Sequence, residues 1–555
     1  MLSMENMKNK NKPVSWLFHV AGKKKIWILI LSMIQILHSG CGVVLAVVLK
    51  EAVDQVVAGS RDGFYRMSFT FIGILVFSVI LTALNRQLDE FTAASFENQF
   101  KGRLFAVLLH KDYDKIVAKH SGEWMNRLTS DTGIVADGLT HILPGLSAMF
   151  VKLLGALFLI LMYLPKLVYI LIPGAMVALV VTYALRRKMK MLHRRVQKAQ
   201  DRLQAYLQEN LQSLLVIRSF VKEKAVSGQS ARYMDGHKKS RMQRIAFSNL
   251  CNTGMLVVIH LLYLLCIGYC CFGILEGTIT YGTLLAMMQL VGQIQDPIAN
   301  ISGYMPKWYG MVASAERLME AESYSENREA SLEILEIRSF YENELVRFGL
   351  EHVTFSYSQE GDMALCDQSM EIQKGEFVAI TGDSGCGKST MLKLLLGLYP
   401  LEQGMCFIET QDGTMKMGPK YRRLFAYVPQ GNHLMSGTIE QIVSFGEPEP
   451  DPGKIENALK VACALDFVKN LPEGIQTSLL EGGAGLSEGQ MQRIAVARAI
   501  YSDCPVLLLD ESTSALDENT ERQLLENLRK MTDKTVVIVT HRKAALTFCD
   551  RCLRV

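Results

Sequence analysis

Long apolar runs dominate the N-terminal half of the chain. Residues 26–49 contain no Asp, Glu, Lys or Arg, and about 20 apolar residues are enough to cross a bilayer as a helix. The pattern predicts six transmembrane helices, at residues 26–49, 68–85, 142–164, 167–185, 251–275 and 284–305. Lys152 interrupts the third run and Asp296 the sixth. One such run could be a buried core helix of a soluble protein, but six in one domain indicate a membrane domain.

The connections between these runs differ in charge. Lys and Arg are abundant between the second and third runs, and the fourth run is followed by Arg186-Arg187-Lys188. The connections at 165–166 and 276–282 are short and poor in both residues. Because positive residues stay on the cytoplasmic side, the long connections and both termini are predicted to be cytoplasmic.

The long connections are predicted to be helical. Residues 186–246 are rich in Gln, Arg, Lys, Leu and Ala with few Gly or Pro, which favours continuous helix. Before the first run, residues 14–18 fit an amphipathic helix on the inner leaflet, with Trp16 and the lysines at 23–25 as anchors. Plain solvation explains that lysine patch equally well.

In the second half, a strand, a glycine-rich loop and a helix follow one another. Residues 377–380 are apolar and predict a buried strand, and residues 391–396 predict a helix. The loop between them reads GDSGCGKST, the P-loop spacing, in which backbone N–H groups cradle phosphates. Lys388 would reach the β- and γ-phosphates, and Ser389 would ligate Mg²⁺. The predicted phosphate-binding residues are Gly382, Asp383, Ser384, Gly385, Cys386, Gly387, Lys388, Ser389 and Thr390.

Two carboxylates end a second apolar run, residues 506–509. Such a run fits a parallel strand that is buried on both faces. Asp510 at its end is predicted to hold Mg²⁺, and Glu511 to accept a proton from the attacking water. The polar residues that follow, from Ser512 to Ser514, leave a helix-capping role as the alternative for either carboxylate.

These motifs resemble the nucleotide-binding domain of the ATP-binding cassette (ABC) superfamily. Leu486-Ser-Glu-Gly-Gln490 is similar to the family signature LSGGQ, and residues 514–517 resemble its D-loop. The resemblance implies that Tyr357 stacks on adenine, that Gln430 contacts Mg²⁺ and senses the membrane domain, and that His541 contacts the γ-phosphate. Glu481 lies where exporters of this family carry an acidic residue before the signature.

Family membership implies a dimer in which each ATP lies between one P-loop and the other subunit's signature helix. Ser487, Gly489 and Gln490 would then contact the nucleotide of the partner, where a helix N-terminus favours phosphate. Glu488 replaces the first signature glycine. A carboxylate near the γ-phosphate is unfavourable unless its side chain points to solvent, so weakened function is expected.

The first half resembles the transmembrane domain of exporter-type ABC proteins. Residues 121–131 and 209–220 are similar to the two coupling-helix regions of that family. The predicted fold is therefore a multi-domain membrane protein, with a six-helix all-α transmembrane domain and an α/β P-loop domain. The predicted bounds are 1–325 for the transmembrane domain, 326–345 for a linker and 346–555 for the cassette.

One membrane domain and one cassette make a half-transporter, which needs a second subunit, either itself or a different chain. We expect ATP-driven export of a drug-like, lipid or peptide substrate across a bacterial plasma membrane, with ATP and Mg²⁺ as cofactors. An importer on the same fold and an ATP-binding regulatory subunit are the alternatives. The net charge of +4 is too small to indicate a nucleic-acid partner.

Polar residues inside the apolar runs are candidates for a translocation path. Hydrogen bonding between helices is the alternative, and it explains more than half of them better. The candidates are Gln35, His38, Lys152, His260, Gln289, Gln293 and Asp296.

Overall fold

The structure is a computed structural model that describes residues 13–325, 332–357, 363–383, 385–431, 434–480, 483 and 485–555. Side chains are not described at 168, 170–183, 186, 259 and 295–302, so the Asp296 carboxylate lies outside the description. Two compact units make up the chain: Met1–Phe105 with Met125–Glu320, and Ala106–Trp124 with Ala321–Val555. The predicted domain bounds remain predictions.

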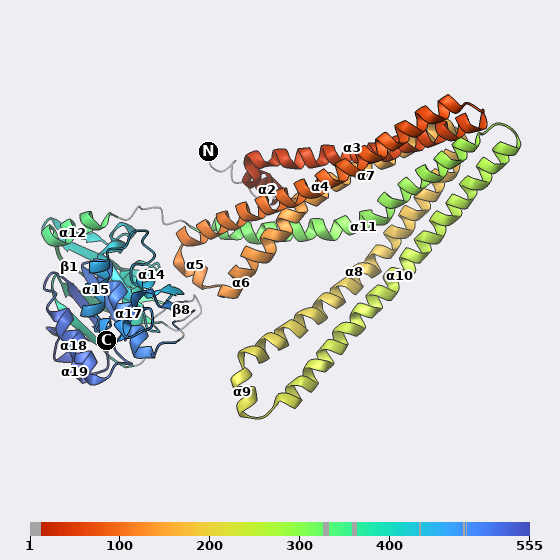
Figure 1. Ribbon diagram of the computed structural model, residues 1–555. Coiled ribbons are helices and arrows are strands. Elements are labelled where there is room, and N and C mark those ends of the chain that lie inside the picture. The colour runs from red at the N-terminus through yellow and green to blue at the C-terminus, as the bar shows by residue number, and fades with distance from the viewer. Residues whose placement is uncertain are drawn as a thin grey trace. The chain divides into compact units, whose positions relative to one another are not determined.

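Helices joined by short turns make up the described residues of the first unit (Figure 1). Some of its helices continue into the second unit. In chain order they are α2 (Pro13–Ala21), η1 (Gly22–Lys24), α3 (Lys25–Val57), α4 (Arg61–His110), α6 (Ser121–Asn126), η2 (Arg127–Asp131), α7 (Thr132–Tyr163), η3 (Pro165–Leu167), α8 (Val168–Gln212), α9 (Leu214–Ser219), α10 (Glu223–Leu275) and α11 (Tyr281–Ser323).

Each of the six predicted spans falls on one long helix, namely α3, α4, α7, α8, α10 and α11, apart from Leu164 and Leu167 at the ends of the third and fourth spans. Among the described residues, four stretches are long and apolar enough to cross a membrane: Pro13–Val57, Arg61–His110, Ser121–Tyr163 and Glu223–Leu275. The prediction of a helical transmembrane domain followed by an α/β domain is confirmed.

Glycines on α7 allow neighbouring helices to approach closely. A Cβ at Gly138 would lie 2.5 Å from the Met311 sulfur, and one at Gly145 would lie 2.2 Å from the Tyr304 hydroxyl. Both neighbours belong to α11, and the order of the pairs makes the two helices antiparallel. Small residues are the usual means of close packing between membrane helices, because apolar burial drives little association in lipid.

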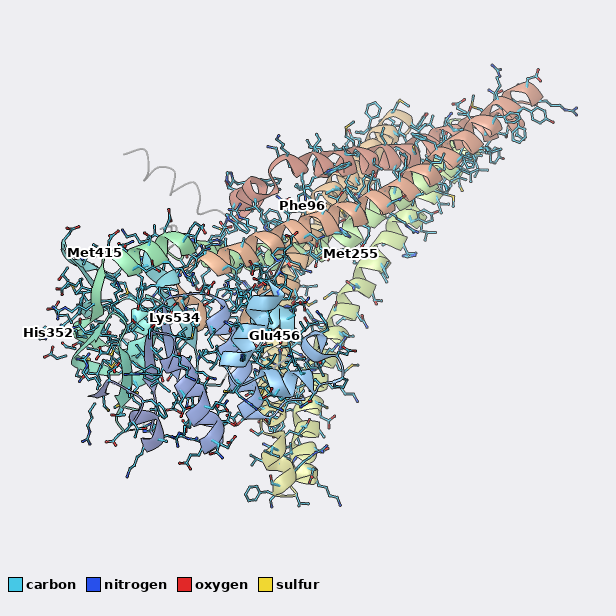
Figure 2. All side chains as sticks on the ribbon, turned by 60° about the vertical axis from the view of Figure 1, so that its left-hand side comes forward. Phe96, Met255, His352, Met415, Glu456 and Lys534 are labelled. Atoms are coloured by element: carbon cyan, nitrogen blue, oxygen red, sulfur yellow. The ribbon has the colours of Figure 1, made fainter. Side chains whose placement is uncertain are left out.

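Two other pairs of helices pack along each other in this unit. Helix α3 packs along α7, and α8 packs along α10 (Figure 1). The N-terminal helix α2 contacts α4 through Trp16 and Phe100, whose ring centroids are 5.9 Å apart. Phe96, labelled on α4 in Figure 2, is fully buried one turn away. The prediction of a helix at 14–18 is thus confirmed, with Leu17 buried.

The prediction of continuous helix over residues 186–246 is wrong in one respect. Helix α8 ends at Gln212, the short α9 follows, and α10 begins only at Glu223. Ser213 and Phe220 leave the helical region at φ −96°, and Val221 adopts a left-handed φ of +51°. The composition favoured helix on both sides but did not mark these two turns.

The second unit contains α5 (Tyr113–Val117) and an α/β domain with three sheets. An antiparallel sheet has the order β2-β1-β4-β5, a parallel sheet the order β11-β3-β10-β9-β6, and β7 pairs with β8. The strands are β1 (Leu345–Phe355), β2 (Leu365–Gln373), β3 (Phe377–Thr381), β4 (Gln403–Thr410), β5 (Gly413–Lys416), β6 (Phe425–Val428), β7 (Gly437–Thr438), β8 (Ser478–Leu479), β9 (Val506–Asp510), β10 (Thr535–Val539) and β11 (Arg551–Arg554).

Helices pack on both faces of the parallel sheet, and two apolar cores result. All five residues of β9 and of β10 are buried, as expected for central parallel strands. The helices are α12 (Ile334–Asn343), α13 (Lys388–Leu395), η4 (Pro419–Leu424), α14 (Ile439–Val443), α15 (Pro452–Val461), α16 (Leu465–Lys469), η5 (Gly474–Gln476), α17 (Glu488–Tyr501), α18 (Glu518–Arg529) and α19 (Lys543–Leu546).

Candidate nucleotide-binding site

The candidate site lies where four parallel strands end. Strands β3, β10, β9 and β6 are neighbours in one sheet, and their pairings are parallel. Their carboxyl ends therefore meet at one edge, which is where ligands bind in open α/β sheets. The loop residues that follow these four strands include almost all of the predicted site residues. The exceptions are Tyr357 and the signature helix.

The P-loop connects β3 to α13, and its glycines have a positive φ. Gly385 and Gly387 have φ of +87° and +98°. A Cβ at Gly387 would lie 2.7 Å from the Ala364 carbonyl oxygen, so this position has no room for a side chain. The strand and helix predicted on either side of the loop are both present.

Lys388 folds back over the loop that precedes it. Its Nζ donates hydrogen bonds to the carbonyl oxygens of Gly382, at 3.0 Å, and Asp383, at 2.8 Å. The side chain is buried to 6% exposure at the start of α13. This arrangement places an ammonium group inside a ring of backbone groups, where an anionic ligand would replace the carbonyl partners.

Asp510 is held by two hydroxyl groups. Ser389 Oγ donates to its Oδ1 and Tyr427 Oη donates to its Oδ2, each at 2.9 Å. The carboxylate residue is 1% exposed. Burial raises the pKa of the Tyr427 phenol, and the nearby Asp510 charge raises it further, so the phenol remains a donor at neutral pH.

Glu511 lies between Gln430 and His541. Gln430 Nε2 donates to Glu511 Oε2 at 2.8 Å, and His541 Nε2 lies 3.7 Å from Glu511 Oε1. Glu511 also has a φ of +51°, a conformation that costs a non-glycine residue about 1–3 kcal/mol and is concentrated at functional sites. The three side chains reach this point from the ends of β9, β6 and β10.

Tyr357, from the loop after β1, reaches the same region. Its hydroxyl is 3.0 Å from Thr390 Oγ1, on the helix that follows the P-loop. Its ring makes edge contacts with Phe355 and Tyr399, and half of the residue is exposed. An exposed aromatic face beside the P-loop helix is suited to stacking on a planar base.

The signature residues form the N-terminus of α17. Ser487 caps the helix: its Oγ accepts from the Gln490 N–H, while Gln490 Oε1 accepts from the Ser487 N–H. Glu488 is the first helical residue, and its side chain is exposed. A carboxylate in the first turn complements the helix dipole, which gives this substitution a stabilising local role.

Gly489 adjoins the D-loop, residues 514–517. A Cβ there would lie 2.8 Å from the Ala515 carbonyl oxygen. One turn further along α17, Gln492 donates to Ser514 Oγ and accepts from the Ala515 N–H. Arg542 donates to the carbonyl oxygens of Ser514 and Leu516. These contacts connect the signature helix, the D-loop and the loop containing His541.

Two predicted residues lie outside the described part of the chain: Ser384 of the P-loop and Glu481 before the signature. Conversely, Tyr427, Gln492 and Arg542 contact the site or its loops, and the sequence analysis assigned them no function. The only signal for Tyr427 was its place on the strand before Pro429-Gln430, a position from which side chains reach the sheet edge.

The donor set at this edge fits Mg²⁺ and a nucleotide triphosphate. A hydroxyl and a carboxylate, Ser389 and Asp510, are already in contact, and hard oxygen donors of this kind are those that Mg²⁺ prefers. The loop of glycine N–H groups and Lys388 supply positive charge for phosphates. The same edge thus offers a metal position, a phosphate cradle and a carboxylate, Glu511, beside them.

A P-loop domain joined to a set of membrane-length helices is the architecture of an ATP-dependent membrane transporter. Residues 28–298 match the family model of the ABC transporter transmembrane region, and residues 365–514 match that of the ABC transporter. The chain belongs to the ABC transporter superfamily, with an exporter-type transmembrane region fused to one cassette.

Similar proteins cover nearly the whole chain. It is 27% identical over 552 residues to "Putative multidrug export ATP-binding/permease protein YgaD" of Bacillus subtilis, covering 95% of this chain and 92% of that protein. It is 26% identical to the ATP-dependent lipid A-core flippase of Vibrio cholerae, covering 89% and 85%. A bacterial Atm1-family ABC exporter solved with ATP bound has the same fold, with a TM-score of 0.80, 21% identity and coverage of 95% and 93%.

Proposed function

We propose that this multi-pass membrane protein exports a substrate at the expense of ATP hydrolysis, working as one half of a dimeric transporter. The observation that carries the proposal is the constellation at the edge of the parallel sheet. Lys388, Ser389 and Asp510 converge there with Glu511 and its two neighbours, Gln430 and His541. Names of similar proteins that refer to export support the direction of transport.

In the proposed mechanism the P-loop residues 382–390 hold the phosphates of ATP, and Tyr357 stacks on the base. Ser389, Asp510 and Gln430 would hold Mg²⁺, which would supply positive charge to the phosphates. Glu511 accepts the proton of the attacking water, and its carboxylate is held by Gln430 for that purpose. His541, which lies beside the other carboxylate oxygen of Glu511, contributes a hydrogen-bond donor toward the γ-phosphate.

Two cassettes are needed for a complete site. Ser487, Gly489 and Gln490 lie at a capped helix N-terminus, and their contacts within this chain go to α17 itself and to the D-loop. We propose that this helix end binds the ATP held by the partner subunit's P-loop. Closing of the two cassettes on ATP would then drive the membrane domain, and hydrolysis would reset it.

We propose the bacterial plasma membrane as the location, with the cassette and both termini in the cytoplasm. The basic residues of the long connections support this orientation, and the cassette must meet cytosolic ATP. The substrate is proposed to be a drug-like molecule, a lipid or a peptide. The names of similar proteins refer to multidrug export, to a lipid A-core flippase and to leukotoxin translocation.

ATP turnover by the purified full chain in lipid nanodiscs tests the proposal. We expect Glu511→Gln to lower the ATPase rate by about 10²–10⁴-fold while ATP binding persists, because the proton acceptor alone is removed. Glu526→Gln is the matched control, since Glu526 pairs with Arg522 on the exposed face of α18. Equal rates in the wild type and the Glu511→Gln variant would contradict hydrolysis by this chain alone.

Oligomeric state is measured on the same nanodisc preparation, and the direction of transport is measured in inside-out vesicles. A dimer with substrate-stimulated turnover supports a self-sufficient transporter. A monomer without turnover points to a different partner subunit, and ATP binding without turnover in the dimer favours the regulatory alternative. Accumulation of substrate inside inside-out vesicles indicates export, and ATP-dependent loss from such vesicles indicates import.

A further inference from the structure

Helices of the first unit form a partly open cavity of about 510 Å³. This volume falls within the range of small-molecule sites, about 300–1,000 Å³. Four helices supply the wall: α3, α4, α7 and α11. The lining residues are Gln35, His38, Ser39, Thr82, Asn85, Gly145, Ala148, Met149, Lys152, Gly303, Tyr304 and Lys307.

The charged side chains on the described part of this wall are lysines. Two lysines line the cavity, Lys152 from α7 and Lys307 from α11, together with His38 from α3. None of the lining residues in the described part of the chain is Asp or Glu. Lys152 also lies within a predicted membrane span, where an ammonium group is costly and usually faces a site or a water-filled space. The described part of the cavity wall therefore places ammonium groups at the cavity, one of them within a predicted span.

Neutral polar groups accompany the lysines. The Tyr304 hydroxyl passes over Gly145, where a Cβ would lie 2.2 Å from it, so the glycine keeps room for the phenol. Asn85 Oδ1 is buried and has no hydrogen-bond partner among the described residues. An unsatisfied buried oxygen of this kind costs about 1–3 kcal/mol unless a ligand or water supplies a donor.

We propose that this cavity binds an anionic group of the transported substrate, a carboxylate or a phosphate, through Lys152 and Lys307. The proposal rests on the proposed function and assigns its substrate class. Ammonium groups recognise either oxyanion as point charges, and Tyr304 and Gln35 can donate further hydrogen bonds to it. The source of the anion is a soluble molecule or a lipid headgroup.

Equilibrium dye binding tests the charge preference without requiring transport. Carboxyfluorescein and rhodamine 123 share a xanthene skeleton and carry opposite charges. Fluorescence anisotropy is measured with the full-length protein in phosphatidylcholine nanodiscs, with empty nanodiscs subtracted. We expect carboxyfluorescein to bind at least about tenfold more tightly than rhodamine 123. We also expect each of Lys152→Gln and Lys307→Gln to weaken carboxyfluorescein binding by about three- to tenfold, since each removes one of two cations.

Lys166→Gln is the matched control, because Lys166 lies in the exposed connection η3 and does not line the cavity. Lys307 is exposed, so its variant tests the proposal even where Lys152→Gln fails to fold. Carboxyfluorescein binding that is unchanged in both variants, equal or tighter binding of rhodamine 123, or binding of neither dye would overturn the proposal.

Two further measurements separate the possible outcomes. Phosphatidylglycerol added to the nanodiscs displaces the dye if the recognised anion is a lipid headgroup, and leaves it bound if the recognised anion is a soluble molecule. Dye that binds with the expected selectivity to a protein whose ATPase rate is unchanged in Glu511→Gln supports anion recognition and contradicts the proposed ATP-driven function. The two proposals can therefore fail independently.

Discussion

Tyr427 donates a hydrogen bond to Asp510 across two neighbouring strands, with 2.9 Å between the phenol oxygen and Oδ2. The strands β6 and β9 pair in parallel, and Tyr427 lies opposite Leu508 in their register. Ser389 holds the other carboxylate oxygen. The buried Asp510 is therefore fixed from two sides before any metal binds.

This contact makes Tyr427 a positioning residue for the proposed metal site. Tyr427→Phe should leave one buried carboxylate oxygen without its donor, at a cost of about 1–3 kcal/mol. We expect a higher Mg²⁺ requirement for ATPase activity, with the rate at saturating Mg²⁺ reduced less than tenfold. The measurement is ATPase rate against Mg²⁺ concentration.

Tyr421→Phe provides the control for that experiment. Tyr421 is also largely buried in the cassette, but its hydroxyl contacts the Met415 sulfur and not the site. An unchanged Mg²⁺ dependence in Tyr427→Phe would show that Ser389 alone positions Asp510.

Glu488 should have opposite effects on the helix and on the proposed nucleotide contact. Its carboxylate lies in the first turn of α17, where it contributes about 0.3–1 kcal/mol to helix stability. Glu488→Gln is thus expected to lower the thermal midpoint slightly. In the proposed dimer the same change would remove a charge near the nucleotide of the partner subunit, so the KM for ATP should fall by about two- to fivefold. An unchanged KM would place the carboxylate in solvent, away from the phosphate.

Gly489→Ala tests the neighbouring contact with the D-loop. The new methyl group would lie 2.8 Å from the Ala515 carbonyl oxygen, so either α17 or the D-loop must move. We expect at least a tenfold loss of ATPase activity, because a displacement of about 1 Å in a positioning element can cost 10²-fold. Gly453→Ala is the control, since Gly453 lies in the first turn of α15, where a Cβ meets only the Asp451 carboxylate at 3.4 Å.

Local motifs made much of this molecule predictable. The apolar runs marked the six long helices, and the P-loop and the two carboxylates marked the edge of the sheet, because each signal spans fewer than about 25 residues. Contacts such as Tyr427 with Asp510 were not predictable. They depend on the register of strands that lie far apart in the sequence.

Two features of the membrane region were also not predictable from the sequence. Lys307 lies beyond the predicted end of the sixth span, and only the continuation of α11 to Ser323 brings it to the cavity wall. The turns near Ser213 and Val221 were missed because the surrounding composition favours helix throughout. Neither feature has a signature in hydropathy alone.

Arg127 should be the most sensitive polar residue of the first unit. It is 2% exposed, and it donates to the Arg317 carbonyl oxygen and to Glu320 Oε2, both at 2.7 Å. Arg317 in turn pairs with Asp131, one π-turn after Arg127. Glu320 is 42% exposed, so the main loss in Arg127→Ala is that of a buried side chain and its two hydrogen bonds, and we expect the thermal midpoint to fall by several degrees. Arg522→Ala, in an exposed pair on α18, is the control and should change it little.

Asp550 gives a prediction about pH. Its Oδ1 accepts from Arg529, and its Oδ2 accepts from the Phe377 N–H at the start of β3, the strand that leads into the P-loop. The Arg529 hydrogen bond lowers the pKa of Asp550 below its ordinary value, and the Phe377 N–H lowers it further. Because the folded pKa is the lower one, the stabilisation is fully present above the unfolded pKa of about 4 and is lost as pH falls through the folded pKa. Asp550→Asn should therefore lower the thermal midpoint at neutral pH, and the difference between its midpoint and that of the wild type should narrow toward pH of about 3.

Thermal unfolding of the full chain at stepped pH measures this difference. Asp412→Asn is the matched control variant, because Asp412 is exposed in the β4–β5 turn. If the difference in thermal midpoint between Asp550→Asn and the wild type is constant with pH, the charge of Asp550 does not cause the stabilisation.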